Sequence, residues 1–247
     1  MLEIRNINKT FNPGTINANH ALRDLSLDLT DGESIAVIGG NGAGKSTLLN
    51  LLLRLYDVSE GRVLLDGRDI RTIPYEQLRE KFGVVFQNDF LYADTVEENI
   101  RFGRDITSED IVKATKITQA HDFISSFSDG YNHMLSPHGT NISGGQKQRI
   151  LISRAIAANP EILILDDSSS ALDYKTDAAL RRALAENMGD TTLVTVAQRV
   201  SSVKDCSVIM VLDEGRIIGI GKHEELLEKC PEYREISESQ MGGAIVD

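Results

Sequence analysis

The chain has 247 residues, of which 41% are hydrophobic and 26% charged, an ordinary balance for a globular protein with a sizeable core. Its formal net charge of −11 argues against a broad nucleic-acid-binding face. Cys206 and Cys230 lack metal-ligand spacing, which is typical of free thiols in a reducing cytosol, and no apolar run approaches the length of a membrane span.

The first part of the chain alternates apolar and polar residues, a pattern typical of half-buried strands. It does so over Leu2–Ile7 and Leu25–Leu29, with the turn Asn12–Gly14 and a polar loop between them. We therefore expect a small antiparallel β layer here. Phe11 ends the first of these elements and, as a lone aromatic residue, is as compatible with a core position as with a functional one.

A phosphate-binding loop follows this β layer. The apolar run Ser34–Ile38 predicts a buried parallel strand, and the leucines from Leu48 onward have helical spacing. Between them, residues 39–46 match the complete pattern Gly-x-x-x-x-Gly-Lys-Ser. Glycines let backbone N–H groups approach phosphate oxygens, while Lys45 can contact the β- and γ-phosphates and Ser46 can ligate Mg²⁺. This loop predicts binding of a nucleoside triphosphate.

The middle of the chain changes to helical patterns from Asn88 to about Asn159, which predicts an inserted helical subdomain. Before it, the buried strand Phe82–Phe86 delivers Gln87 at its carboxyl end, where ligands gather in α/β sheets. Within it, Thr107–Asp110 resembles a capping box. Near its end, Ser143–Gly145 opens another helix, with a serine cap and two glycines that expose the first N–H groups. This helix start is either a second anion site or a plain helix beginning.

Parallel-sheet character returns with the apolar strand Ile162–Leu165, which ends in two carboxylates. Asp166 is suited to hold Mg²⁺ beside the phosphate loop, and Asp167 lies where a base for an attacking water could stand. Thr192–Val196 predicts another buried strand, and a hairpin is expected around Asp213–Gly215. Short polar helices and a frayed tail are expected after it.

Taken together, the motifs resemble the nucleotide-binding domain of an ATP-binding-cassette (ABC) transporter. In chain order they are GGNGAGKST from residue 39, Gln87, ISGGQKQR at 142–149, ILILDD at 162–167 and SALD at 170–173. The resemblance covers essentially the whole chain, and residues 87–100 are similar to the exporter branch. The N-terminal segment is more similar to importer-type or stand-alone cassettes. That mixture would suit an excised or recombined chain or a separately encoded subunit.

The resemblance implies an α/β fold, namely a P-loop NTPase (RecA-like) core with an antiparallel β subdomain and an inserted helical subdomain. Within a single domain 1–247, residues 1–87 and 160–247 would form the ATP-binding core and residues 88–159 the helical subdomain. Two cassettes would sandwich two ATP molecules as a homodimer or a heterodimer. A transmembrane transporter domain would bind near Phe90–Val96 and hold the chain on the cytoplasmic side of a membrane, and no nucleic-acid partner is expected.

The resemblance also implies roles for individual residues. Phe11 would stack on adenine, and Asp173 would signal between the two ATP sites. The residues expected around Mg²⁺ are Ser46, Gln87 and Asp166. Those expected to act in catalysis are Asp167, Gln198, Lys45 and Gln87. ATP would contact Phe11, Gly39, Asn41, Gly42, Ala43, Gly44, Lys45, Ser46 and Thr47 of one cassette and Ser143, Gly144, Gly145 and Gln146 of the other.

Two positions depart from the family pattern. Asp167 replaces the usual glutamate, which withdraws the carboxylate by roughly 1 Å, and misplacement on that scale can cost about 10²-fold in rate. Gln198 replaces the usual histidine and cannot carry an imidazolium charge. This pair resembles the degenerate half of a heterodimeric exporter, so we expect slow hydrolysis at the chain's own site.

Several alternatives stay open at this stage. The two replacements could be tolerated in an active ATPase, or the chain could be a non-hydrolysing regulatory ABC subunit. A soluble ABC ATPase of DNA repair or translation would normally show large insertions or tandem cassettes. A small-molecule kinase would have no use for the ISGGQ segment at 142–146.

Overall fold

The computed structural model describes residues 1–168 and 170–242, so the expected C-terminal tail lies outside the described residues. The chain divides into two compact units by its internal contacts. Unit 1 joins Met1–Arg79 to Thr192–Asp247, and unit 2 is the continuous segment Glu80–Thr191. The expected extent of the helical subdomain, residues 88–159, stays a prediction.

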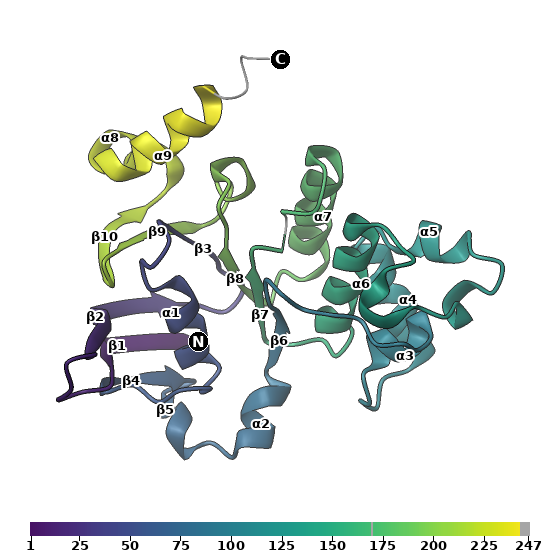
Figure 1. The fold of residues 1–247 in the computed structure, drawn as a ribbon, viewed down its shortest axis with the longest axis horizontal. Helices are drawn as coiled ribbons and strands as arrows, with labels where there is room; N and C mark the ends of the chain where they lie inside the picture. Colours follow the sequence, from purple (N-terminus) through teal and green to yellow (C-terminus); the bar gives the residue numbers. More distant parts are fainter. Residues whose placement is uncertain (169, 243–247) are drawn as a thin grey trace. The chain divides into compact units, whose positions relative to one another are not determined.

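An antiparallel sheet forms one layer of unit 1, with strands in the order β2-β1-β4-β5 (Figure 1). Its strands are β1 (Leu2–Phe11), β2 (Asn19–Leu29), β4 (Glu60–Leu65) and β5 (Arg68–Asp69). The alternation predicted for β1 places Leu2 and Ile4 in the core, each at most 2% exposed. A register shift after Ile4 brings Ile7, which is also fully buried, to the core as well. The antiparallel β layer predicted from the sequence is confirmed.

The second sheet of unit 1 is built around β3. β3 (Ser34–Gly39) pairs in parallel with β8 (Thr192–Val196) and with β9 (Val208–Asp213), and β10 (Arg216–Gly221) runs antiparallel to β9. Because β3 is covered on both faces, its residues 35–38 are fully apolar and at most 2% exposed. The helix α1 (Lys45–Leu52) follows it and packs on β3 and β2.

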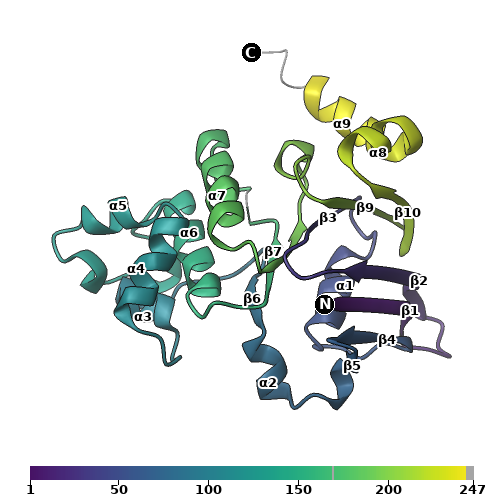
Figure 2. The same cartoon turned by 180° about the vertical axis from the view of Figure 1, so that it is seen from behind.

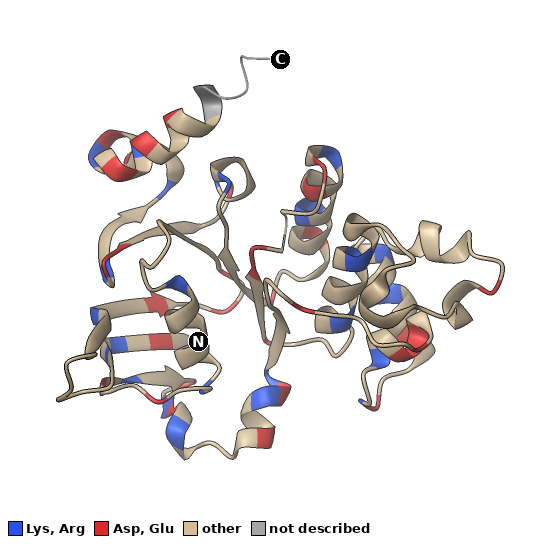
Figure 3. Ribbon diagram, viewed as in Figure 1, with Lys and Arg blue, Asp and Glu red and all other residues tan. Residues whose placement is uncertain are grey.

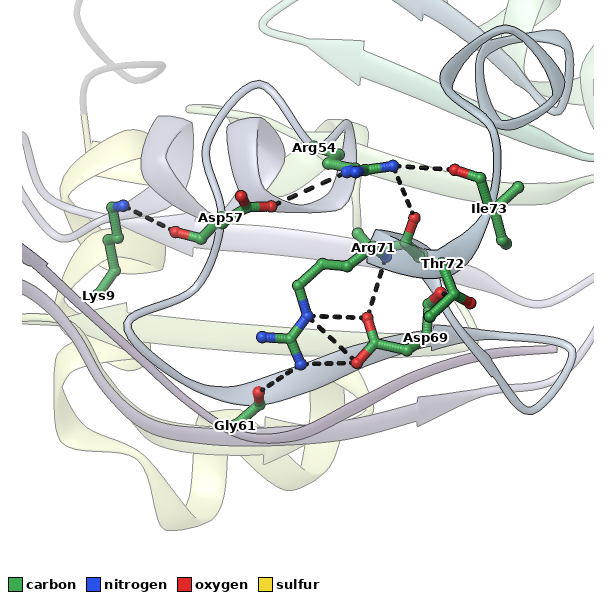
Figure 4. A network of polar contacts seen from close by, with 9 residues as sticks. Lys9, Arg54, Asp57, Gly61, Asp69, Arg71, Thr72 and Ile73 are labelled. Carbon is green, nitrogen blue, oxygen red and sulfur yellow. Dashed lines mark hydrogen bonds and ion pairs between the residues drawn. The ribbon is translucent and has the colours of Figure 1, made fainter.

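Polar side chains fix the segment that follows α1 (Figure 4). Arg54 donates from Nη1 to the carbonyl oxygens of Ile70 at 3.1 Å and Ile73 at 2.9 Å, which holds the short helix η1 (Ile70–Thr72). Nε and Nη2 of Arg71 donate hydrogen bonds of 2.6–3.2 Å to the carboxylate oxygens of Asp69. This hydrogen bonding lowers the pKa of the Asp69 carboxyl. The chain then enters α2 (Tyr75–Glu80).

The two C-terminal helices of unit 1 follow β10 (Figures 1 and 2) and contribute to its core. α8 (His223–Lys229) packs on β10, and α9 (Pro231–Gly242) packs on α8 and on η4 (Val200–Ser202). Tyr233 has no exposed surface, its hydroxyl lies 2.8 Å from Nδ1 of His223, and burial raises its pKa to about 12. Residues that the sequence pattern identifies only as short polar helices therefore supply core side chains.

Unit 2 combines a parallel strand pair with helices. The strands are β6 (Phe82–Val85) and β7 (Ile162–Asp166). The helices are α3 (Val96–Arg101), α4 (Ser108–Ile117), α5 (His121–Ser125), α6 (Gly144–Ile156) and α7 (Tyr174–Asn187), with short turns η2 (Gly130–Asn132) and η3 (Pro137–Gly139). The predicted capping box is present, because Thr107 and Asp110 exchange hydrogen bonds at the start of α4.

Charge is mixed over both units, with basic and acidic residues interspersed (Figure 3). Acidic residues nevertheless exceed basic ones, 37 to 26, in the full sequence. Among the helices that the structure describes, none is long and apolar enough to span a bilayer.

Candidate functional site

The phosphate loop ends in a helix start with no side chain capping it. Gly44 occupies the cap position of α1 in the left-handed conformation, with φ of 105°, and makes no side-chain hydrogen bond. The first turn of α1 also contains no acidic residue. The start of α1 and its positive dipole end therefore favour an anion at this position.

Two glycines of this loop are required by close contacts within the chain. A Cβ at Gly39 would lie 2.2 Å from the carbonyl oxygen of Leu212, and one at Gly44 would lie 2.8 Å from the carbonyl oxygen of Ala21. Real Cβ atoms do not approach neighbours so closely, and Gly44 also has a positive φ. The glycine pattern of the loop thus has a steric cause in the packing of unit 1.

Lys45 places its charge at the centre of the loop. Its Nζ donates to the carbonyl oxygens of Gly39 at 2.7 Å and Gly40 at 2.8 Å, so the side chain lies along the loop. The next residue, Ser46, is exposed. The loop therefore presents an ammonium group, a hydroxyl and helix N–H groups together, which is a suitable set for a phosphate chain.

Phe11 belongs to an aromatic cluster that the sequence pattern did not reveal. Its ring lies 5.4 Å from the ring of Tyr56, edge to face, and Tyr56 is 48% exposed. Nζ of Lys9 lies 5.0 Å and 5.5 Å from the two ring centroids and donates to the carbonyl oxygen of Asp57 at 2.7 Å (Figure 4). Tyr56 follows α1 and no local motif marks it, so only the fold brings it beside Phe11.

Gln198 lies at the same edge of unit 1 as the phosphate loop. Val37 pairs with Val196 in the parallel β3–β8 ladder, so the two strands end side by side. The phosphate loop begins just after β3, and Gln198 stands two residues after β8. The carboxyl ends of neighbouring parallel strands are where α/β proteins bind ligands.

Unit 2 brings together the polar residues that follow its two strands. Val85 pairs with Leu165 in the parallel β6–β7 ladder. Beyond that pair, Nε2 of Gln87 makes a long hydrogen bond of 3.5 Å to Oδ2 of Asp167. Asp166 is 9% exposed, and Asp167 has a φ of 50°, a left-handed conformation that aspartate tolerates better than most residues.

The start of α6 has the cap predicted from its sequence. Oγ of Ser143 accepts from the Gln146 N–H at 3.2 Å, and Oε1 of Gln146 accepts from the Ser143 N–H at 2.9 Å. A Cβ at Gly144 would meet Ala171 only at 3.8 Å, an ordinary van der Waals distance. Unlike Gly39 and Gly44, this glycine is not required by the chain's own packing.

A buried arginine joins α6 to the segment after Gln87, and sequence reasoning missed it. Arg154 donates to the carbonyl oxygens of Asn99 at 2.8 Å and Phe90 at 3.0 Å, and also to the side-chain oxygen of Asn99 at 3.2 Å. Its guanidinium lies 4.5 Å from the ring of Phe102 and 3.6 Å from the carboxylate of Asp89. The Arg154 side chain is 9% exposed, and burial lowers its pKa.

Comparison with known proteins then decides the family. The family model described as ABC transporter matches residues 22–170, which is more than half of the chain. The chain belongs to the ABC transporter family. Family membership confirms the resemblance to ABC nucleotide-binding domains and the P-loop fold class, both of which the motifs predict.

Similar ABC proteins extend well beyond this chain. ATP-binding cassette sub-family B member 6 of Xenopus tropicalis is 39% identical over 98% of the chain and 28% of its own length. ABC transporter B family member 22 of Arabidopsis thaliana is 42% identical over 85% of the chain and 17% of its own length. The solved structure of a bacterial Atm1-family ABC exporter with ATP bound matches with a TM-score of 0.90 and 34% identity. That match covers 97% of this chain and 42% of the exporter chain, so the chain spans less than half of each relative.

Proposed function

We propose that this ABC chain binds and hydrolyses ATP to drive export across a membrane, together with a second cassette and a transmembrane domain. The observation that carries the proposal is the phosphate loop, where Lys45 and the uncapped start of α1 meet. Its positive groups complement the β- and γ-phosphates of ATP. The names of the similar proteins, among them an exporter with ATP bound, support the same conclusion.

The residues predicted to hold nucleotide and metal have suitable chemistry. Phe11 and Tyr56 offer a partly exposed aromatic surface for adenine. Ser46, Gln87 and Asp166 offer hydroxyl, amide and carboxylate oxygens, the hard donors that suit Mg²⁺. When bound, Mg²⁺ would neutralise charge on the β- and γ-phosphates.

A second ATP-binding cassette would complete the site in a homodimer or a heterodimer. Space remains beside Gly144, where a Cβ would make only an ordinary contact. A glycine that its own chain does not require leaves backbone N–H groups open to close approach by another molecule. The segment Ser143–Gln146 would therefore contact the ATP of the partner cassette.

A transmembrane domain would bind unit 2 through an exposed aromatic patch formed by Phe90, Tyr92 and Phe102. These side chains are 41%, 46% and 46% exposed. Their rings contact one another, at 4.9 Å between Phe90 and Tyr92 and 5.5 Å between Tyr92 and Phe102. Clustered apolar side chains in water mark an interaction surface. Attachment there would hold the chain on the cytoplasmic side of a membrane.

The first prediction tests the phosphate loop. Replacing Lys45 by Ala removes a charge-assisted contact worth about 1.5–3 kcal/mol, so Mg-ATP should bind roughly 10- to 150-fold more weakly. Titration calorimetry of both proteins measures the change. Lys113→Ala is the matched control, since Lys113 is exposed on α4 and should bind ATP like the unmodified chain. Equal ATP affinity in the Lys45 variant would exclude this loop as the phosphate site.

A second prediction concerns association. Two copies of a chain with a net charge of −11 repel one another, so the chain should be monomeric without nucleotide. Mg-ATP should allow dimers to form, because each nucleotide would bridge two chains. Light scattering with and without Mg-ATP, at low and high salt, measures this. A stable dimer without nucleotide at low salt would contradict the prediction.

A further inference from the structure

α9 packs directly against the segment that follows Gln198. That segment continues into η4, whose residue Val200 is 6% exposed and shares a core cluster with Tyr233 of α9. Ile236 packs against the same cluster one turn further along α9. Gln240 follows on the same helical face and so reaches the backbone of this segment.

The amide of Gln240 makes two hydrogen bonds to that backbone. Its Oε1 accepts from the Val200 N–H at 2.8 Å, and its Nε2 donates to the carbonyl oxygen of Gln198 at 2.6 Å. A primary amide offers one acceptor and one donor face, so the two contacts together fix its orientation. The two bonded groups flank Arg199 in the chain. In a parallel β-ladder, one residue likewise bonds the carbonyl before and the N–H after the residue opposite to it. Arg199, the residue before η4, has no side-chain acceptor, and Gln240 accepts from the first N–H of η4.

We propose that Gln240 is a positioning residue for Gln198, through which α9 sets the backbone at the carboxyl end of β8. This inference rests on the proposed function and on the catalytic role expected for Gln198 in ATP hydrolysis. A shift of about 1 Å in a positioned group can cost about 10²-fold in rate. Because Gln240 bonds the main chain, its effect does not depend on which side chain stands at position 198. Gln240 lies outside all of the sequence motifs that predict nucleotide binding.

Two substitutions of Gln240 distinguish the effect of its bond to the Val200 N–H from that of its bond to the Gln198 carbonyl oxygen. Gln240→Met keeps a similar length but removes both hydrogen bonds. Gln240→Glu keeps the acceptor for the Val200 N–H and places an oxygen against the Gln198 carbonyl in place of the donor. Glu238→Gln, at an exposed position of the same helix, is the control. The readouts are amide exchange at Val200 by NMR and the kcat and KM of phosphate release with Mg-ATP.

We expect exchange at Val200 to rise about fivefold in Gln240→Met, the factor for a net hydrogen bond of about 1 kcal/mol, and to stay near its original rate in Gln240→Glu. In both variants kcat should fall about tenfold, while KM should change less than twofold because the phosphate loop is untouched. The control should change neither readout.

Unchanged exchange at Val200 in Gln240→Met would overturn the proposal, and so would raised exchange with an unchanged kcat. If the unmodified chain binds no ATP, the proposed function is wrong and the catalytic role of Gln240 falls with it. That outcome is recognised because the exchange difference between the Met and Glu variants would persist without nucleotide.

Discussion

Replacing Asp167 by Glu and Gln198 by His together should raise ATP hydrolysis by about 10²-fold or more over the unmodified chain. Glutamate adds a methylene that extends the carboxylate by roughly 1 Å, which in the proposed site would bring it closer to an attacking water. In the proposed site, histidine would add a group that can carry positive charge next to the γ-phosphate. In the structure Asp167 is half-buried, and its Oδ2 is 3.5 Å from Nε2 of Gln87. Steady-state phosphate release by the unmodified chain, both single variants and the double variant measures the effect.

The two replacements should act together. Residues that act as a unit are non-additive, so the double variant should exceed the product of the single ones. Asp122→Glu lengthens an exposed carboxylate on α5 and should leave the rate unchanged. An unmodified chain that already turns over on the order of 1–10 s⁻¹, with no gain in the double variant, would show that its site is not degenerate. ATP binding without hydrolysis in all four proteins would favour a non-hydrolysing regulatory subunit.

Replacing Arg154 by Leu should lower the free energy of unfolding by about 3 kcal/mol or more. The substitution removes the buried guanidinium together with its hydrogen bonds. The carbonyl oxygens of Asn99 and Phe90 then lack that donor. Asn99 is 1% exposed, so water does not readily take the place of the guanidinium. Urea unfolding followed by circular dichroism measures the loss. Arg154→Lys keeps the positive charge but not the planar fork of donors, so it should retain only part of the stability.

Arg182→Leu is the matched control for this measurement. Arg182 lies on α7 with its side chain 82% exposed and pairs with Glu186 at 2.7 Å. Exposed ion pairs contribute about 0–1 kcal/mol, so its loss should change stability little. Equal destabilisation by the two leucine variants would mean that the buried network of Arg154 contributes no more than a surface ion pair.

Features that depend on near neighbours in sequence could be predicted. The caps at Thr107 and Ser143 each bond residues three positions away, and their sequences indicated both. The phosphate-loop glycines were also predicted from their motif, although part of their steric cause lies far along the chain, at Leu212 in the case of Gly39. A motif therefore identifies the residues even where it does not reveal what packs against them.

Contacts between distant segments could not be predicted. Arg154 bonds Asn99 across 55 positions, and Gln240 bonds Gln198 across 42. Each of these side chains is polar in an otherwise ordinary helical pattern, and such a pattern indicates a solvent-exposed face unless the fold supplies a partner. The burial of Tyr233 was missed for the same reason, since one aromatic residue in a polar helix gives little periodicity. The individual roles in binding and catalysis stay predictions.

The discontinuity of unit 1 has a consequence for biosynthesis. β3 (Ser34–Gly39) finds both of its neighbours in residues 192–213, so its apolar strand emerges from the ribosome long before anything can pair with it. At about 5–20 residues per second the delay is roughly ten to thirty seconds. Unit 2 is continuous and can collapse during that interval, whereas the nascent strand remains a target for chaperones or for pairing between polysome neighbours. Slower translation of the intervening segment would prolong that exposure.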